Sequence, residues 1–284
     1  MTGRIVISGG GGLVGRVLAG QARADGRDVV ALTSSEWDVT DPTAAERHIA
    51  DGDVVVNCAA FTKVDAAESE PDRAHAVNAG GAENVAQACA RAGATFIHIS
   101  TDYVFSGSLQ RPYDIDDPTG PLSVYGRTKL AGEMLVLAAM PDAHIVRTSW
   151  IYEGADGSDF AAVMRRAARG DGTVDVVADQ IGSPTYVVDL CRALLQIADG
   201  AIREPVLHAA NAGSASRFEQ AQAVFAALGE DVSRVRPVGS DEHPRPAPRP
   251  AYSALSSAKS EAAGLTPLRP WREALAEALA TASR

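Results

Sequence analysis

A glycine-rich loop between an apolar strand and a helix constrains the fold of this chain more than any other feature. The apolar run Ile5-Val6-Ile7-Ser8 leads directly into Gly9-Gly10-Gly11-Gly12-Leu13-Val14-Gly15, and an alanine-rich helical pattern follows as far as Ala24. Glycines at this point make a tight turn and let the backbone approach a pyrophosphate at the positive end of the helix. The spacing Gly9-x-x-Gly12-x-x-Gly15 therefore predicts a dinucleotide-binding site.

Short apolar runs alternate with helical patterns along the rest of the chain. We expect further strands at residues 28–33, 53–57, 95–100, 143–147, 174–177 and 206–210. We expect helices at residues 74–92, 124–139, 160–169, 187–198, 257–264 and 271–282, a helix that opens at Pro42 after an Asp41 cap, and a turn-like acidic segment at 64–71. Such alternation predicts an α/β fold of the Rossmann type, with a doubly wound parallel sheet.

The length of 284 residues suffices for a dinucleotide domain and a smaller lobe. We expect residues 1–150 to form the dinucleotide-binding domain, with later segments returning to it. Residues 151–284 are expected to form mainly a C-terminal α/β substrate-binding lobe.

The bulk composition excludes several classes of partner. A net charge of −10 argues against a nucleic-acid polymer or an anionic membrane as a partner. The chain shows no secretory signal and no apolar run near the roughly 20 residues of a membrane span. Cys58, Cys89 and Cys191 have no paired spacing, so neither a disulfide framework nor a zinc site is indicated. We expect a cytoplasmic protein whose cysteines are small core residues.

A tyrosine and a lysine four residues apart follow the strand that ends at Ser100-Thr101. On a helix, Tyr125 and Lys129 share one face. An ammonium roughly 4 Å from a phenol contributes about 4 kcal/mol at an effective dielectric near 20, so Lys129 is expected to lower the pKa of Tyr125 from about 10 toward 7. Tyr125 could then act as a general acid toward a carbonyl oxygen that the Thr101 hydroxyl steadies.

The same helix, residues 124–139, is expected to be amphipathic. Its apolar side would consist of Val124, Leu130, Met134 and Leu137.

The ends of the second and third strands bear on the cofactor. The second strand runs into Thr33-Ser34-Ser35, where NAD-specific sites commonly have an acidic residue for the ribose hydroxyls. Uncharged hydroxyls tolerate a 2′-phosphate, so we expect NADPH, with NADH tolerated. Ala59 and Ala60 follow the third strand, and small residues there leave room for a ligand.

A proline-rich stretch at residues 241–250 carries Arg245 and Arg249. One interpretation is an extended linker. The other is a stiff support that holds two arginines against the pyrophosphate of a nucleotide-sugar substrate.

With these features the chain resembles the extended short-chain dehydrogenase/reductase superfamily and, within it, the dTDP-4-dehydrorhamnose reductase family in an actinobacterial form. The resemblance covers nearly the whole chain. Its motifs are Gly9-x-x-Gly12-x-x-Gly15, Trp37-Asp38-Val39-Thr40-Asp41, Asn57-Cys58-Ala59-Ala60-Phe61-Thr62-x-Val64-Asp65-x-Ala67-Glu68, Ser100-Thr101-Asp102-Tyr103-Val104-Phe105, Tyr125-Gly126-x-Thr128-Lys129-Leu130-Ala131-Gly132-Glu133, Arg147-Thr148-Ser149-Trp150-Ile151-Tyr152, Asp179-Gln180-x-Gly182-Ser183-Pro184-Thr185 and Arg249-Pro250-x-x-Ser253-x-Leu255.

The resemblance implies reduction of the C4 ketone of dTDP-4-dehydro-β-L-rhamnose, with Tyr125 protonating O4 as hydride reaches C4. Thr101, Tyr125 and Lys129 would be the catalytic set. The implied cofactor contacts are Gly9, Gly12, Leu13, Val14 and Gly15 at the pyrophosphate, Asp38 and Val39 on the adenine side, and Ala59, Ala60 and Lys129 at the nicotinamide ribose. Tyr125 is an implied cofactor contact as well. The implied substrate contacts are Thr101, Asp102, Tyr103, Trp150 and Arg249.

Three positions depart from the family pattern. Leu13 stands where glutamine is frequent, and Tyr252 where asparagine is common. Some members form a magnesium-linked dimer through glutamates, and Val17 occupies one of those positions. We therefore expect no metal site, and either a monomer or a weak homodimer.

Two alternatives remain open. One is a sister 4-ketoreductase of another dTDP-deoxysugar. The other is a non-catalytic regulatory subunit, similar to the methionine adenosyltransferase regulatory protein, although an intact Thr101, Tyr125 and Lys129 argues against it.

Overall fold

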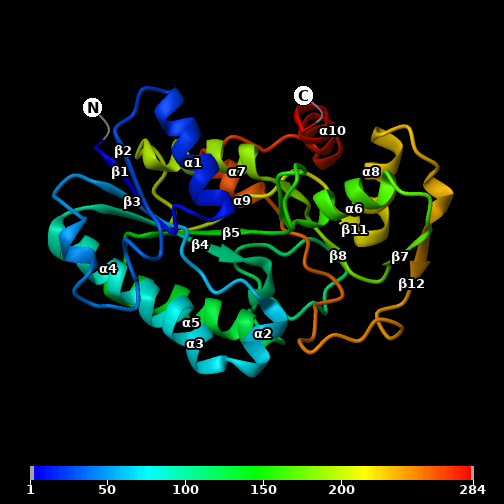
Figure 1. The fold of residues 1–284 in the computed structure, drawn as a ribbon. Helices are drawn as coiled ribbons and strands as arrows, with labels where there is room; N and C mark the ends of the chain where they lie inside the picture. The colour runs from blue at the N-terminus through cyan, green and yellow to red at the C-terminus, as the bar shows by residue number, and fades with distance from the viewer. Residues whose placement is uncertain (1–2, 283–284) are drawn as a thin grey trace.

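The computed structural model describes residues 3–282 and consists of a large parallel sheet, covered by helices on both faces, with a second lobe at one end (Figure 1). The sheet has the strand order β10-β5-β4-β3-β1-β2, and every neighbouring pair is parallel. Its strands are β1 (Ile5–Ser8), β2 (Val29–Leu32), β3 (Val54–Asn57), β4 (Thr95–Thr101), β5 (His144–Thr148) and β10 (Val206–His208). The expected Rossmann-type fold is confirmed.

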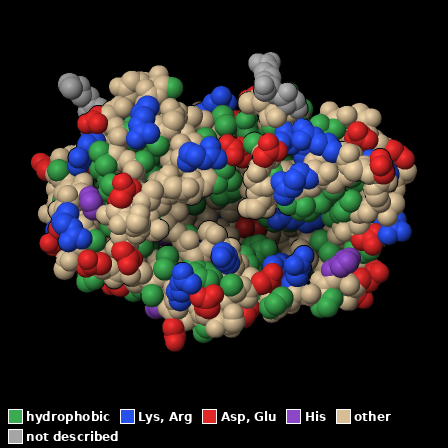
Figure 2. All heavy atoms as spheres, viewed as in Figure 1, with side chains coloured by type: hydrophobic (Ala, Val, Ile, Leu, Met, Phe, Trp, Pro, Cys, Tyr) green, Lys and Arg blue, Asp and Glu red, His purple; other side chains and the backbone are tan. Residues whose placement is uncertain are grey.

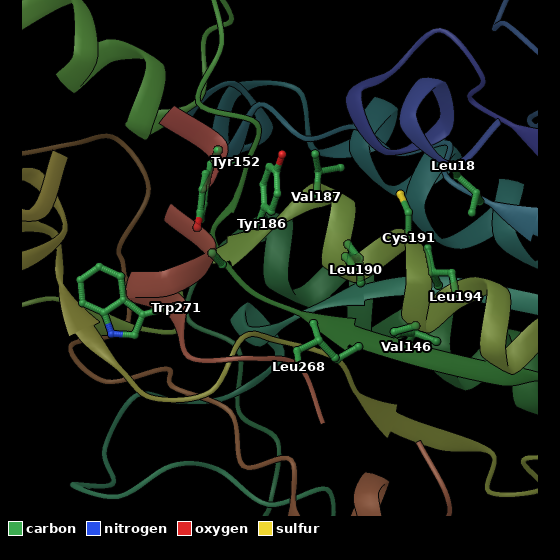
Figure 3. Packing of buried hydrophobic residues seen from close by; sticks show 14 of the residues in the cluster. Leu18, Val146, Tyr152, Tyr186, Val187, Leu190, Cys191, Leu194, Leu268 and Trp271 are labelled. Carbon is green, nitrogen blue, oxygen red and sulfur yellow. The ribbon is translucent and has the colours of Figure 1, made fainter. Parts of the chain in front are cut away.

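Helices from distant parts of the chain cover the two faces of this sheet. On one face α1 (Leu13–Ala24) packs against α7 (Val187–Ala198), and on the other α4 (Gly81–Ala92) packs against α5 (Val124–Ala139) (Figure 1). The apolar side of α7, with Leu190, Cys191 and Leu194, lies in one buried cluster with Leu18 and Val146 (Figure 3). These contacts place the amino end of α1 at the edge of the sheet where the strands end.

The second lobe is built from three small sheets and the helices around them (Figure 1). The sheets pair β6 (Ile151–Tyr152) with β9 (Thr185–Tyr186), β7 (Val174–Val177) with β12 (Val235–Val238), and β8 (Ile181–Gly182) with β11 (Ala215–Ser216). The helices are α6 (Phe160–Ala168), α8 (Arg217–Ala227) and α10 (Trp271–Thr281), while α9 (Ala258–Ala262) packs beside β10. Because α7 and β10 belong to the large sheet layer, the chain re-enters that layer after residue 151.

Local structure differs from expectation between strands β2 and β4. No α-helix opens at Pro42; Asp41 instead accepts hydrogen bonds from the Thr43 amide and hydroxyl at 2.9 and 2.8 Å, and one 3-10 turn (Ala45–Arg47) follows. The acidic segment expected to be a turn contains α2 (Val64–Ser69). The expected helix at 74–92 begins earlier, as α3 (Pro71–His75), and passes through a π-helical turn (Ala76–Gly80) before α4.

The expected apolar side of α5 is confirmed in part: Val124, Leu130 and Leu137 pack against the core, but Met134 does not. Met134 is 66% exposed, whereas Lys129, Gly132, Glu133 and Val136 are buried. A Cβ on Gly132 would lie 2.2 Å from the Asn78 carbonyl oxygen, so the helix packs very closely on the π-helical turn. The side chains of Lys129 and Glu133 face inward because their hydrogen-bond partners lie on the large sheet.

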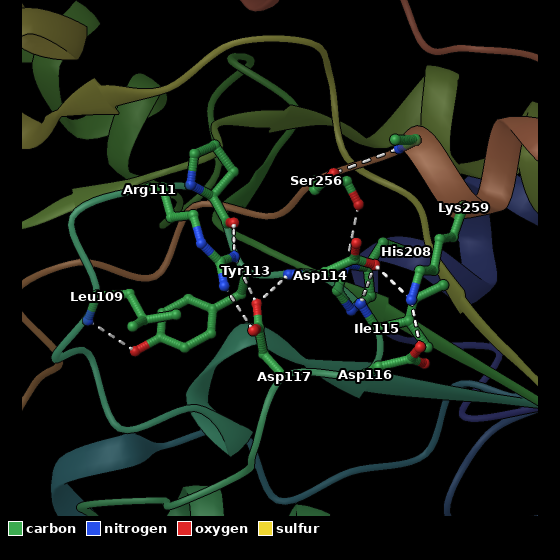
Figure 4. Close-up of polar contacts among 12 residues, drawn as sticks. Leu109, Arg111, Tyr113, Asp114, Ile115, Asp116, Asp117, His208, Ser256 and Lys259 are labelled. Carbon is green, nitrogen blue, oxygen red and sulfur yellow. Dashed lines mark hydrogen bonds and ion pairs between the residues drawn. The ribbon is translucent and has the colours of Figure 1, made fainter.

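The loop between β4 and α5 is fastened at several points (Figure 4). Arg111 donates two hydrogen bonds to Asp117, both of 2.7 Å, and the Leu109 amide donates to the Tyr113 hydroxyl at 3.2 Å. Lys259 of α9 pairs with Asp116. This loop leads directly into α5 and so helps to fix where Tyr125 lies.

Candidate functional site

The glycine loop lies at the point where the strand order of the large sheet reverses. The chain passes from β1 outward to β2 and then returns to the other side of β1 as β3, which opens a crevice at the carboxyl ends of β1 and β3. Gly9 has φ 67°, and a Cβ there would lie 2.7 Å from the Ala59 amide nitrogen. A Cβ on Gly15 would lie 2.5 Å from the Gly9 oxygen. Glycine is therefore required at position 9 to seat the loop on the segment after β3, and at position 15 to let α1 pack closely on the loop.

A cavity of about 460 Å³ occupies this crevice. Figure 2 shows that this face of the molecule is hollowed between the two lobes. The cavity is lined by Gly12, Leu13, Val14, Gly15, Asn57, Cys58, Ala59, Ala60, Thr62, Ile99, Ser100, Thr101, Tyr125, Lys129, Thr148, Trp150 and Ile151. The expected catalytic residues and most of the expected cofactor contacts thus share one space.

Six expected site residues lie outside this lining: Gly9, Asp38, Val39, Asp102, Tyr103 and Arg249. Gly9 shapes the turn beneath the loop. Asp38 is exposed and accepts hydrogen bonds from the Thr40 amide and hydroxyl at 2.9 and 2.7 Å. Val39 is buried, and a Cβ on Gly81 would lie 2.7 Å from its Cγ2. The adenine-side roles of Asp38 and Val39 stay predictions.

Thr101 and Tyr125 meet at the floor of the cavity. Burial is the main influence on Tyr125 and raises the pKa of its phenol, while a hydrogen bond with the Thr101 hydroxyl opposes that rise. Thr101 ends β4, and Tyr125 stands in the first turn of α5, which Ser123 caps by accepting a hydrogen bond from the Gly126 amide at 3.1 Å. Tyr125 therefore keeps its proton at neutral pH.

The expected effect of Lys129 on Tyr125 is wrong for this structure. Lys129 Nζ lies 3.1 Å from His98 Nε2 and donates to the Ile99 oxygen at 2.7 Å, so it points toward the sheet. Burial lowers the pKa of Lys129 to about 8, against an opposing influence of Glu133. A lysine turned away from the phenol and drawn toward its neutral form does not depress the tyrosine pKa.

Asp102 lies behind the cavity, where it joins the two lobes. Its Oδ2 accepts hydrogen bonds from Ser149 at 3.0 Å and from Ser253 at 2.5 Å, and its Oδ1 accepts one from Thr101 at 3.1 Å. Burial raises the pKa of Asp102 to about 6, and these three hydroxyl groups oppose the rise. Asp102 thus fixes Thr101 of the cavity to Ser149 and Ser253 behind it.

Trp150 is held in a strained backbone conformation at the rim of the cavity. Its φ of 45° is the only positive value for a non-glycine residue among residues 3–282, and such strain is typical of functional sites. The indole ring covers Gly182, where a Cβ would lie 2.4 Å from the ring. The guanidinium carbon of Arg217 lies 3.6 Å from the centre of this ring.

Arg217 is a site residue that the sequence reasoning missed. Burial lowers its pKa to about 10, and Tyr103 and Asp102 act in the opposite direction. The one signal in the sequence is its position directly after Ser216, whose capping box with Glu219 fixes where α8 begins. Tyr103 in turn lies edge-on to Tyr125, with ring centres 5.8 Å apart.

Arg249 is engaged in an ion pair between the lobes. Its guanidinium donates two hydrogen bonds to Asp65 of α2, at 2.6 and 3.0 Å. Arg245, the other arginine of the proline-rich stretch, is exposed. Burial lowers the pKa of Arg249, but the hydrogen bonds with Asp65 outweigh that effect and raise it, with a smaller contribution from Tyr103. Arg249 does not contact the cavity in this arrangement.

A carboxylate stands at the end of β2, where the sequence reasoning noted only hydroxyls. Glu36 accepts hydrogen bonds from the Thr33 amide at 2.8 Å and from the Thr33 hydroxyl at 2.7 Å. A Cβ on Gly11 would lie 3.4 Å from Thr33 Cγ2, so this group borders the glycine loop. The Thr33 contacts hold the pKa of Glu36 below its usual value.

Within residues 3–282 the structure offers neither a metal-binding cluster nor a membrane-spanning helix. No group of three or more histidine, cysteine or acidic side chains is placed to hold a metal ion. In the same residues, every helix is too short or too polar for a bilayer crossing.

Comparisons with known proteins agree with this geometry. A family model described as the RmlD substrate binding domain matches residues 3–284. The dTDP-4-dehydrorhamnose reductase of Mycolicibacterium smegmatis is 65% identical over 282 residues, covering 99% of this chain and 86% of that protein. The reductase of the same name from Mycobacterium tuberculosis H37Rv is 61% identical over 281 residues, covering 98% and 92%. A crystal structure of the Bacillus anthracis dTDP-4-dehydrorhamnose reductase in complex with NADP has a TM-score of 0.92 at 35% identity, covering 99% and 100%.

A glycine loop at the switch point of a parallel sheet, with a threonine, a tyrosine and a lysine in one cavity, defines an oxidoreductase with a Rossmann-type fold. The chain belongs to the RmlD substrate-binding-domain family, the family of the dTDP-4-dehydrorhamnose reductases.

Proposed function

We propose that this protein reduces the C4 ketone of dTDP-4-dehydro-β-L-rhamnose with NADPH and forms dTDP-β-L-rhamnose. The observation that carries the proposal is the shared cavity of Thr101, Tyr125 and Lys129 beside the glycine loop, in a chain of this family. The loop suits a dinucleotide because Gly12, the residue before α1, leaves little bulk around the backbone N–H groups of the first turn of that helix.

The residues of the cavity have distinct parts in this reaction. The nicotinamide of the bound cofactor supplies a hydride to C4 of the sugar. Tyr125 holds its proton at neutral pH and gives it to O4, and the Thr101 hydroxyl orients the same oxygen. Lys129 would hold the nicotinamide ribose. Trp150 and Tyr103 would border the sugar, and Arg249 would reach the diphosphate after leaving Asp65.

The test is NADPH consumption by the purified protein on dTDP-4-dehydro-L-rhamnose generated in situ, with the sugar product identified and magnesium either present or chelated. We expect rapid consumption, dTDP-L-rhamnose as product, and no need for magnesium. The 4-keto-6-deoxy-D-glucose nucleotide serves as the comparison substrate, since faster turnover of that sugar would favour the sister-ketoreductase alternative. Tight NADPH binding without turnover of either sugar would favour a regulatory role.

We further propose that the protein works in the cytoplasm as a monomer or weak homodimer. Sedimentation across a range of protein concentrations tests the oligomeric state. A dimer that persists at the lowest concentrations would contradict the proposed monomer or weak homodimer.

A further inference from the structure

A buried chain of hydrogen bonds crosses the sheet behind the cavity and ends on Lys129. Ser8 of β1, Asn57 of β3 and His98 of β4 lie directly opposite one another in register. Ser8 Oγ donates to Asn57 Oδ1 at 2.6 Å, Asn57 Nδ2 lies 3.0 Å from His98 Nδ1, and His98 Nε2 lies 3.1 Å from Lys129 Nζ. All four side chains are at most 2% exposed. Water therefore does not supply alternative partners, and the donors and acceptors must match one another.

The orientation of the Asn57 amide follows from a backbone contact. The Ala59 N–H donates to Asn57 Oδ1 at 3.1 Å, and a backbone N–H can only donate. The atom facing Ala59 and Ser8 must therefore be the oxygen, which leaves the amide NH₂ facing His98. Because an NH₂ group also only donates, His98 Nδ1 must accept and carries no hydrogen.

The orientation of the next hydrogen bond follows from the first. A neutral imidazole has one N–H, which must be on Nε2 and points at Lys129 Nζ. An ammonium has three donors and no acceptor, so a charged Lys129 would set two donors against each other across 3.1 Å. A neutral amine accepts from His98 with its lone pair and still donates to the Ile99 oxygen at 2.7 Å.

We infer that His98, locked by Asn57 as the Nε2–H tautomer, is a positioning residue that favours the neutral amine of Lys129 in the cofactor-free site, and that cofactor binding at mildly alkaline pH is accompanied by proton uptake at Lys129. The inference deepens the proposed function, on which the role of Lys129 toward the cofactor rests. The step is a protonation without electron transfer: one proton from solvent converts the amine to an ammonium. Since the ammonium cannot accept from His98, the same event frees Nζ to turn into the cavity.

The other titratable groups around Lys129 are compatible with this assignment. Burial draws the pKa of Lys129 down to about 8 and that of His98 well below its usual value. Glu133 favours the ammonium, but its carboxylate is shared with Arg147 and Ser100. Cys58 and Tyr125 carry no charge at neutral pH, because burial raises both pKa values, that of Cys58 to about 12.

The composition of the chain makes the state of Lys129 directly measurable. Only three lysines are present, and the other two, Lys63 and Lys259, are exposed. In NMR titrations of the cofactor-free protein with ¹³Cε-labelled lysine, we expect the Lys129 resonance to have a midpoint below about pH 8.5, far below that of Lys259, whose hydrogen bond with Asp116 raises its pKa above the ordinary lysine value of about 10.4. A Lys129 midpoint above about 8.5 would overturn the inference.

The Asn57→Asp variant reverses the pattern of donors. A carboxylate accepts from His98 Nδ1–H, so Nε2 loses its hydrogen and accepts from a Lys129 ammonium. We expect ¹⁵N-histidine spectra to change from the Nε2–H to the Nδ1–H form and the Lys129 midpoint to rise by one unit or more. The matched control is His144→Gln, a change at another buried histidine, whose Nδ1 faces the Glu204 oxygen at 2.9 Å. The His144→Gln variant should change neither the tautomer of His98 nor the titration midpoint of Lys129.

Should Asn57→Asp fail to fold, the wild-type ¹⁵N spectrum decides alone, since an Nδ1–H or doubly protonated His98 contradicts the assignment. Proton uptake is measured by calorimetric titration of NADPH at about pH 9, in buffers of different ionisation enthalpy. We expect uptake approaching one proton for the wild type and much less for Asn57→Asp. Binding without proton uptake in the wild type would overturn the second half of the inference. None of these readings requires turnover, so they are independent of the proposed reaction.

Discussion

Loss of water, more than pairing of charges, sets the acid–base properties of the side chains around the cavity. Burial raises the pKa of Tyr125 and Asp102 and lowers that of Lys129, and in each case the shift favours the neutral form. Burial in the free site thus disfavours charge on all three side chains until ligands bring their own charge.

Replacing the proposed proton donor gives the most direct test at the residue scale. Tyr125→Phe should bind NADPH normally but lose about two to four orders of magnitude in turnover, the usual span for a general acid. The control is Tyr152→Phe, because the buried Tyr152 hydroxyl has no hydrogen-bond partner within residues 3–282. Near-normal turnover of Tyr125→Phe would exclude Tyr125 as the acid.

The carboxyl group of Asp102 should make stability depend on pH. Its pKa near 6 in the folded protein exceeds the ordinary value of about 3.9, so the folded state binds this proton more tightly. The associated stability is fully present below about pH 4 and is lost as pH rises through about 6, by roughly 3 kcal/mol. Asp102→Asn keeps one acceptor oxygen that can serve both Ser149 and Ser253, and it removes that loss. In urea unfolding, the variant should therefore gain stability relative to wild type between pH 4 and pH 8; a difference that does not change with pH would refute this account.

The carboxylate at the end of β2 should influence the choice of cofactor. Glu36 is exposed beside Thr33, and a negative charge there opposes the 2′-phosphate of NADPH. Glu36→Gln should increase the ratio of NADPH to NADH affinity, and the increase should shrink as salt is added. The exposed Glu46, which pairs with Arg91, offers the control variant Glu46→Gln. An unchanged ratio would place the 2′-phosphate elsewhere.

At the scale of elements, a buried ion pair fastens α5 to the sheet. Glu133 of α5 accepts hydrogen bonds from Arg147 of β5 at 2.7 and 3.0 Å and from Ser100 of β4 at 2.5 Å. Arg147 is also 5.2 Å from the centre of the Phe105 ring. The helix that carries Tyr125 and Lys129 is thereby fixed against the strand that carries Thr101.

Removing one partner of this pair should be costly, because it leaves the other charge buried and unpaired. We expect Arg147→Met to lower the free energy of unfolding by about 3–5 kcal/mol, and addition of Glu133→Leu to recover part of that loss. The exposed pair of Arg73 and Glu70 supplies the comparison, where Arg73→Ala should cost about 1 kcal/mol or less. Denaturant unfolding of the single and double variants measures these changes in the free energy of unfolding. If Arg147→Met costs as little as Arg73→Ala, the buried pair of Arg147 and Glu133 does not contribute to stability.

Helices whose buried residues are apolar and regularly spaced could be predicted from the sequence. A buried helix face that carries polar residues could not. The helix α7 was expected at residues 187–198 and has those limits, because its apolar residues repeat at helical spacing. For α5 the expected limits 124–139 were also found, but its buried face was predicted only in part because Lys129 and Glu133 face the sheet as well. The π-helical turn that holds Asn78 left no trace in the sequence pattern, since its Thr128 and Phe61 partners come from elsewhere in the chain.

At the scale of the whole molecule, the site depends on contacts between segments far apart in sequence. The glycine loop and the Tyr-Lys pair were recognisable because each is local. The link from Asn57 through His98 to Lys129, and the position of Arg217 over Trp150, arise only when strands and lobes assemble. Local patterns therefore identified the chemistry, while the tuning of that chemistry was visible only in three dimensions.

The ion pair between Asp65 and Arg249 spans the two lobes and holds the arginine away from the cavity. If Arg249 reaches the substrate diphosphate, it must first leave Asp65, so the two interactions compete. The pair is partly exposed, 19% for Arg249 and 34% for Asp65, and such pairs contribute at most about 1 kcal/mol. Asp65→Asn should therefore lower the KM for the nucleotide sugar by up to about fivefold and leave kcat nearly unchanged, whereas Arg249→Ala should raise KM. Arg245→Ala, at the exposed neighbouring arginine, is the control and should have little effect on either constant. A raised KM in Asp65→Asn would mean that Asp65 instead orients Arg249 for binding, and the two residues would then act together on the substrate.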